Sequence, residues 1–402
     1  MNDLPLAGIR VADFGWIFAV PHTTSWLGAL GADVIRIESP KRPDLVRFLG
    51  GTDGQLGINR SGLFHSINFS KRSIALDLTN PAGAEVARRL VACSDIITEN
   101  FGTGVMTKFG LDYEKLRAVK PDIIMMSGTP LGQTGPLAGA IGYGPNSLAF
   151  SGISHLTGYP GGEPSGIGGT WPDFVVGVVM VMGVLAALHY RDRTGEGQYI
   201  DLSIAEMVTG MIPEAMMDFF LNGREQHPIG NRDPDLAPHG AFPTAGDDRW
   251  AAIVTVSDAE FTSLCEVLEA PGLAADARFQ TMAARLQNVD ALEREIGELT
   301  RKFDRDDLVA KLRARHIAAG PMYNTAEIIA DPAMVESGMN VEVDHKEVGR
   351  RVIPGLPVSF SACQPNYYGG PAIGEHTDEV LTQVLGYSPD EITRLRQAGG
   401  VL

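Results

Sequence analysis

The sequence of 402 residues has little cysteine and lacks the common nucleotide-binding motifs. Its three cysteines, Cys93, Cys265 and Cys363, lie far apart without metal-ligand spacing, so we expect neither a disulfide framework nor a metal site. No Gly-x-Gly-x-x-Gly and no Walker-type phosphate loop occurs, which disfavours a nicotinamide or ATP enzyme. Sparse cysteines fit reduced thiols, and we expect a cytoplasmic protein.

Positive charge is also scarce, since 33 Lys and Arg residues stand against 49 Asp and Glu residues. The net charge of −16 argues against nucleic acid and anionic membranes as partners, although a local basic patch could still bind an anionic ligand. The N-terminus lacks the basic start and long apolar segment of a signal peptide.

Long apolar runs are limited to one, which extends from Phe174 to Tyr190. It reaches the lower end of membrane-spanning length, but Gly177 and Gly183 interrupt it and His189 lies near its end. A helix buried in a large core or at a subunit contact fits this pattern better than a membrane span.

Alternating strand and helix patterns fill residues 1 to about 150. Strands are expected at 7–14, 32–38, 73–78, 95–98 and 121–127, and helices at 22–31 and 80–92. Because strand–helix–strand is the unit of a parallel sheet, we predict an α/β fold with an open, Rossmann-like parallel sheet.

The pattern changes after the apolar run. A strand at 198–204, a methionine-rich helix at 205–221 and a proline-rich linker at 222–240 precede shorter strands and helices. We predict a large α/β domain at 1–224, a smaller α+β domain at 225–330 and a C-terminal segment at 331–402 that returns to the large domain. A final helix is expected from Thr377.

Asp173 stands at the mouth of the apolar run, directly after Pro172. The sequence predicts a buried helix capped by Asp173, whose carboxylate would accept hydrogen bonds from the first turn and be favoured by the helix dipole. Both effects favour the ionised, held state that a carboxylate nucleophile needs. An aspartate in this place is more often only a cap, so both interpretations stay open on the residues alone.

Several stretches resemble one enzyme family when their order and spacing are taken together. They are Pro5-Leu-Ala-Gly-Ile-Arg-Val-Ala-Asp-Phe14, Leu30–Glu38, Asn68–Leu78, Glu99-Asn-Phe-Gly-Thr-Gly-Val-Met106, Gly132–Pro136 and Leu185–Gln198. In these stretches the chain resembles the class III CoA-transferases, the CaiB/BaiF or formyl-CoA transferase family, nearly from end to end. The resemblance implies an acyl-CoA:carboxylate CoA-transferase.

The resemblance also implies a mechanism in which Asp173 is the nucleophile. Its carboxylate would attack the donor thioester to give a mixed anhydride, which the released CoA thiolate converts to an aspartyl-CoA thioester. The acceptor acid would then take the CoA by the reverse steps. CoA is thus expected as part of the substrates, with no permanently bound cofactor, and glycine-rich residues 158–169 and 238–246 are candidate oxyanion donors.

The same resemblance assigns the CoA contacts. We expect Leu76, Thr79, Asn100, Phe101, Gly102, Lys108 and Tyr143 to bind CoA, with Arg72 as a nearby cation. Lys108 replaces an arginine of the family and loses its bidentate fork. Ser39 stands where some members have a basic residue, so Lys41 or Arg42 could substitute.

Two departures bear on the reaction. Tyr143 occupies the place of a histidine base in the related α-methylacyl-CoA racemases, which disfavours a racemase-like isomerase without removing it as an alternative. Trp16 and Phe18 make the first loop apolar where transferases for small acids often have polar residues. We therefore predict a hydrophobic or aromatic acceptor, with succinyl-CoA as donor in a benzylsuccinate-type member.

Members of the family form dimers of interlocked chains, so the resemblance implies a homodimer. A hetero-oligomer is the alternative, and within it a non-catalytic subunit, against which the presence of Asp173 argues.

Overall fold

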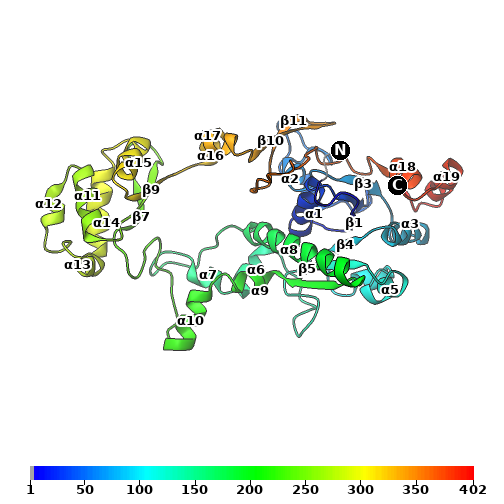
Figure 1. Ribbon diagram of the computed structural model, residues 1–402, viewed down its shortest axis with the longest axis horizontal. Helices are drawn as coiled ribbons and strands as arrows, with labels where there is room; N and C mark the ends of the chain where they lie inside the picture. Colours follow the sequence, from blue (N-terminus) through cyan, green and yellow to red (C-terminus); the bar gives the residue numbers. More distant parts are fainter. Residues whose placement is uncertain (1–3) are drawn as a thin grey trace. The chain divides into compact units, whose positions relative to one another are not determined.

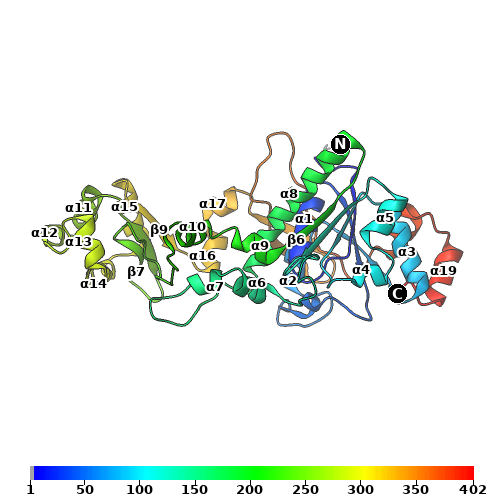
Figure 2. The same ribbon diagram turned by 90° about the horizontal axis from the view of Figure 1, so that it is seen from below.

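The computed structural model describes residues 4–402, which divide into two compact units (Figures 1 and 2). Unit 1 contains the residues up to Ser154, Gly166–Gly223 and Ala333–Leu402. Unit 2 contains His155–Ser165 and Arg224–Pro332. The predicted domain boundaries, after residues 224 and 330, stay a prediction.

Unit 1 is built on a six-stranded sheet whose neighbouring strands are all parallel. In spatial order the strands are β3 (Arg72–Ala75), β2 (Asp33–Glu38), β1 (Arg10–Asp13), β4 (Ile96–Glu99), β5 (Ile124–Thr129) and β6 (Tyr199–Ser203). The predicted open parallel sheet is thereby confirmed. The order reverses direction between β1 and β4, and ligands of such sheets bind beside this reversal, at the carboxyl ends of the strands.

Alternate residues of the central strands β4 and β5 belong to different cores, because both faces of the sheet are covered there. Ile96 and Ile124 pack in the cluster that includes α1 (Ala19–Ala29) and α8 (Trp171–Thr194). Ile97 and Met125 pack in the cluster that includes α3 (Pro81–Ala92). Burial on both faces explains why these strands are continuous apolar runs.

The remaining elements of unit 1 are short and mostly helical. They are η1 (Leu45–Phe48), α2 (Gly62–Ile67), α4 (Val105–Lys108), α5 (Tyr113–Val119), α6 (Gly144–Phe150), α9 (Ile204–Thr209), α10 (Pro213–Asn222), β10 (Asn340–His345), β11 (Gly349–Pro354), α18 (Thr377–Glu379), the π-helix η2 (Val380–Val384) and α19 (Pro389–Gln397). α7 (Ile153–Leu156) and α17 (Pro332–Glu336) lie across the boundaries of the two units.

Unit 2 confirms the predicted smaller α+β part. It has an antiparallel sheet of β7 (His239–Pro243), β8 (Trp250–Val254) and β9 (Ala318–Met322). Its helices are α11 (Asp258–Val267), α12 (Pro271–Ala275), α13 (Met282–Gln287), α14 (Val289–Thr300), α15 (Arg305–Ala314) and α16 (Thr325–Ala330).

The single helix predicted at 205–221 is wrong, because two helices occupy this segment. α9 ends at Thr209 and α10 begins at Pro213. Proline has no N–H to continue a helical ladder but is well suited to the first position of a new helix.

α8 is long and apolar enough to cross a membrane by length and composition alone. In unit 1 it packs beside α1, and Val176, Met180 and Val184 are buried at helical spacing (Figure 1). We therefore interpret α8 as a core helix. Its opposite side exposes Val178, Val179, Met182, Leu185 and Tyr190.

The C-terminal segment returns to unit 1 partly through two buried histidines. The rings of His65 on α2 and His345 on β10 lie 3.9 Å apart. His65 Nε2 is 3.0 Å from the Asn59 carbonyl oxygen, and His345 Nδ1 accepts N–H groups from Glu347 and Val348. Burial is the main cause that lowers the pKa of both rings, that of His65 to about 4, so the pair is neutral at pH 7.

This pair predicts a loss of stability in mild acid. Unfolded histidine binds a proton near pH 6.5, whereas folded His65 resists protonation until about pH 4, so its contribution is full above pH 6.5 and is lost as the pH falls toward 4. Between pH 7 and 5 the free energy of unfolding should fall by up to about 2 kcal/mol through this residue. Urea unfolding of His65→Gln should show a smaller fall than wild type, while the exposed control His189→Gln keeps the full fall. Equal pH dependence in all three proteins would contradict the assignment.

Candidate active site

A pocket of about 380 Å³ lies at the carboxyl ends of four strands of unit 1, where the strand order reverses. Trp16 follows β1, Lys41 follows β2, Leu76 follows β3 and Phe101 follows β4, and all four line the pocket. The pocket therefore stands where the sheet topology predicts a ligand, although the chain has no dinucleotide fingerprint.

Half of the predicted CoA contacts meet in this pocket. They are Leu76, Thr79, Phe101 and Gly102. Two cations also line it: Lys41 Nζ is 2.7 Å from Asp77 Oδ2, and the Arg42 guanidinium lies 5.7 Å from the centre of the Trp16 ring. An apolar wall with cations at its rim suits an aromatic base and phosphates.

The other four predicted contacts lie outside the pocket lining. The Asn100 carboxamide holds the backbone of Trp16, with Oδ1 accepting its N–H at 2.7 Å and Nδ2 donating to its carbonyl at 2.7 Å. Lys108 ends α4, next to Phe109, which does line the pocket. Tyr143 precedes α6 and is exposed.

Arg72 lies at the other end of the sheet. It begins β3 and forms ion pairs with Asp33, at the start of β2, and with Glu379. The pocket gathers at the carboxyl ends of the strands, so Arg72 is engaged in a structural contact away from it.

Asp173 is not the cap of α8, so that detail of the sequence prediction is wrong. The helix begins at Trp171 after Thr170, and Asp173 is its third residue. The reason is that Pro172 occupies the second helical position, where its missing N–H costs no hydrogen bond. The Asp173 side chain therefore does not cap the helix.

The expected ionised state of Asp173 is also not what its surroundings favour. Burial raises the pKa of its carboxyl to about 7, and only its own backbone N–H acts in the opposite direction. Gly144 lies so close that a Cβ there would stand 2.9 Å from Asp173 Oδ2 and 1.8 Å from the Gly169 carbonyl oxygen. A backbone without side chains thus borders the carboxylate on this side, and Gly169 belongs to the loop predicted to supply oxyanion donors.

Aromatic rings surround the next residue of α8. Phe174 lies 6.1 Å from Phe18 and 5.0 Å from His22, measured between ring centres. The predicted substrate residues Trp16 and Phe18 therefore separate: Trp16 lines the pocket, and Phe18 packs beside the residue that follows Asp173.

The residues that fix the loop between Trp16 and Phe18 were missed by the sequence analysis. Ile17 has a positive φ of 63°, and its N–H is bound by Asp44 Oδ2 at 3.1 Å. Arg36 holds the same carboxylate oxygen at 2.6 Å. No local motif announces these contacts, because they join residues far apart in the chain.

Comparisons with known proteins identify the family of the chain. The model of CoA-transferase family III matches residues 6–377. The chain is 34% identical to the succinate–glutarate CoA-transferase of Agrobacterium fabrum over 94% of this chain and 96% of that protein. It is 34% identical to the β subunit of a succinyl-CoA–L-malate CoA-transferase of Chloroflexus aurantiacus over 98% of both chains. A solved CAIB/BAIF family protein from Brucella suis matches with a TM-score of 0.87 and 34% identity, covering 96% of this chain and all of that one.

The raised pKa of Asp173 predicts the pH dependence of catalysis. If the ionised carboxylate reacts, kcat/KM for an acyl-CoA should rise with pH about a midpoint near 7, not near 4 as for an ordinary aspartate. Burial also raises the pKa of Glu99 to about 7, so Glu99→Gln is the control that removes this competing titration. The midpoint should persist in Glu99→Gln. Its loss there, or a wild-type midpoint below 5, would contradict the assignment.

Proposed function

The chain belongs to CoA-transferase family III, and we propose that it transfers CoA from succinyl-CoA to a carboxylic acid through Asp173. Class III CoA-transfer between an acyl-CoA and a carboxylate follows from the family. The proposal that Asp173 is the nucleophile rests on its position. Its partly buried carboxylate lies in the first turn of α8 without capping the helix, in the unit that also holds the pocket. Relatives named for succinate or succinyl-CoA support the donor.

The proposed reaction is a double exchange on one carboxylate. Asp173 attacks the donor thioester carbonyl, a C–O bond forms, the C–S bond breaks, and CoA leaves as thiolate. The thiolate attacks the Asp173 carbonyl of the anhydride and releases succinate, leaving an aspartyl-CoA thioester. The acceptor carboxylate then repeats both steps in reverse order. The raised pKa supports this role because a more basic carboxylate is the stronger nucleophile once it is ionised.

The pocket is proposed to hold the nucleotide end of CoA. Phe101 and Trp16, whose ring centres are 6.1 Å apart in an edge-to-face arrangement, would form the wall for the adenine. Lys41 and Arg42 would meet phosphate oxygens. Lys41 already acts on an anion here, since its hydrogen bond is the first cause of the pKa of Asp77 falling to about 2.

The acceptor is proposed to carry an apolar, aromatic or branched body. Phe18, His22 and Phe174 form a cluster of rings directly after the nucleophile. No cation of the described chain acts on the pKa of Asp173. A short dicarboxylic acid is the second candidate, favoured by the relatives whose names contain glutarate and L-malate.

A homodimer is proposed as the working form. Besides the exposed side of α8, α10 carries a group of exposed apolar residues, namely Met217, Phe219, Phe220 and Leu221. Such a patch on a globular protein marks an interaction site, and a second copy of the chain would cover it. The relative named as a β subunit keeps a hetero-oligomer as the alternative.

Removal of the nucleophile should abolish transfer. In Asp173→Asn, transfer from succinyl-CoA should fall at least about 10³-fold, because an amide cannot form the anhydride. Wild-type protein treated with acyl-CoA and then hydroxylamine should carry a hydroxamate on the peptide containing residue 173, found by mass spectrometry. Asp192→Asn, an exposed aspartate on the same helix, is the matched control and should keep both activity and label. Transfer surviving in Asp173→Asn would remove the assignment.

The acceptor can be tested through Phe18. Phe18→Ala should raise KM for an aromatic acid by about tenfold or more while changing KM for malate or glutarate little, since only the larger body loses apolar contact. Phe150→Ala, an exposed phenylalanine on α6, serves as the control. A wild-type enzyme that prefers the short dicarboxylic acids, with no effect of Phe18→Ala on the preference, would favour the second candidate.

A further inference from the structure

We propose that Asp44 is a positioning residue. By holding Ile17 in a strained conformation, it fixes both Trp16 on the donor side and Phe18 on the acceptor side of the site. Asp44 does not line the pocket, and we propose that it acts through the loop Gly15–Phe18. The proposal deepens the function proposed above and rests on it, because it takes the pocket as the CoA site.

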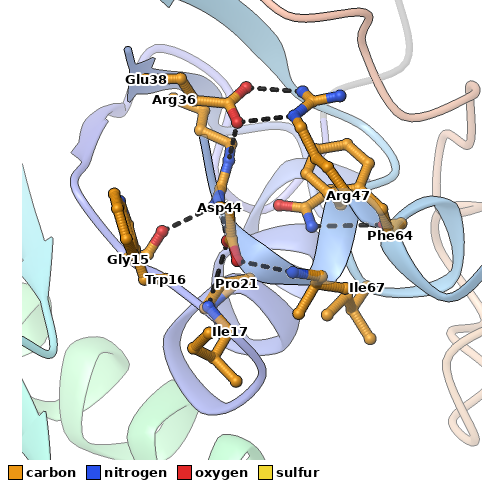
Figure 3. A network of polar contacts seen from close by, with 12 residues as sticks. Gly15, Trp16, Ile17, Pro21, Arg36, Glu38, Asp44, Arg47, Phe64 and Ile67 are labelled. Carbon is orange, nitrogen blue, oxygen red and sulfur yellow. Dashed lines mark hydrogen bonds and ion pairs between the residues drawn. The ribbon is translucent and has the colours of Figure 1, made fainter. Parts of the chain in front are cut away.

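Side chains from outside the loop bind almost all of its backbone polar groups up to Ile17. Figure 3 shows two of these contacts, that of Arg36 with Gly15 and that of Asp44 with Ile17. Asp13 Oδ1 accepts the Gly15 N–H at 2.8 Å, and Arg36 Nη1 donates to the Gly15 carbonyl at 2.7 Å. Asn100 takes the N–H and carbonyl of Trp16, as described above. Asp44 takes the N–H of Ile17 at 3.1 Å.

Ile17 is the residue that most needs to be held. Its φ of 63° is in the left-handed region, which a β-branched side chain rarely adopts. Such a conformation persists only when the surroundings over-determine it, and it gathers at functional sites. With its bond to Asp44 lost, Ile17 would relax to negative φ.

Asp44 is itself fixed by buried charge. One oxygen is held by Arg36 at 2.6 Å and the other accepts the Val46 N–H at 3.0 Å, and neither Asp44 nor Arg36 exposes its side chain to solvent. Arg36 also lies 3.4 Å from Glu38, which Arg47 binds through two hydrogen bonds of 2.6 and 2.8 Å. Figure 3 shows this chain of contacts running from Arg47 to the loop.

The two neighbours of Ile17 face different subsites. On one side, Trp16 lines the pocket between Phe101 and Arg42. On the other, Phe18 packs on Phe174, the residue after the nucleophile. A rotation at Ile17 would move both rings, so one carboxylate controls the binding of donor and acceptor together.

The test is Asp44→Asn, which keeps the shape and the cap of η1 but loses the charge that binds Arg36 and Ile17 together. We expect KM for succinyl-CoA and KM for the acceptor each to rise by about tenfold, which is within the roughly 10²-fold loss that a misplacement of about 1 Å can cause. Both constants report only folded enzyme, whereas partial unfolding lowers the apparent kcat alone. Asp304→Asn is the matched control, the same change at the cap of α15 in unit 2, and should leave both KM values unchanged.

Relief of the strain should rescue the variant. Glycine adopts positive φ without a Cβ penalty, so Ile17→Gly in the Asp44→Asn background should recover part of both KM values, while Ile17→Val in that background should not. If Asp44→Asn does not fold, Asp44→Glu carries the same comparison, because it keeps the charge but displaces it from Ile17.

Unchanged KM values in Asp44→Asn would overturn the proposal, as would a double variant no better than the single one. If wild-type protein transfers no CoA from any acyl-CoA, the proposed function fails instead. The positioning role of Asp44 is then tested separately through the dissociation constant for free CoA, measured by calorimetry. Equal values in wild type and Asp44→Asn would overturn that role.

Discussion

Buried charges beneath the first loop are the constraint on which the site depends. Burying ionised groups is costly unless each is paired, and a pair that is broken leaves an uncompensated charge. Burial would raise the pKa of Glu38, yet Arg36 and Arg47 overcome it and hold that pKa at about 2. Burial also disfavours the charged form of Lys71 and lowers its pKa to about 8, although Asp13 at 3.1 Å acts in the opposite direction. Replacing such pairs by apolar residues often costs no stability, so their value here is better sought in the single conformation that they impose.

Much of the architecture follows from local sequence signals. Asn80 and Pro81 predict the start of α3 where the structure has it, and the alternation of strands and helices predicts the parallel sheet. Leu76 and Phe101 were assigned to CoA by the family resemblance, and the structure brings them into one pocket because each follows a strand of that sheet, whose parallel strands have their carboxyl ends at one edge. Periodicity and caps are properties of neighbouring residues, so they are readable from the chain itself.

The remainder depends on contacts between distant segments. Asp44 binds a residue 27 positions away, and Asn100 binds one 84 positions away, so no local pattern could show that these side chains hold a loop. The positive φ of Ile17 is equally hidden, since isoleucine argues against it. The sequence argument for an ionised Asp173 used the helix terminus but not burial, and burial proves the larger effect on its pKa. Such effects belong to the assembled fold.

The seating of α8 has a consequence for how this scaffold can diverge. A Cβ on Gly177 of α8 would lie 2.7 Å from His22 Nδ1 of α1, and one on Gly128 of β5 would lie 1.9 Å from Met180 Cε of α8. At both glycines, a side chain of one element therefore packs directly against the backbone of the other. A helix wedged this closely can neither slide nor roll without clashes. Asp173 is therefore held in a fixed position, and new substrate ranges can be explored by exchanging loop residues around it without displacing its carboxylate.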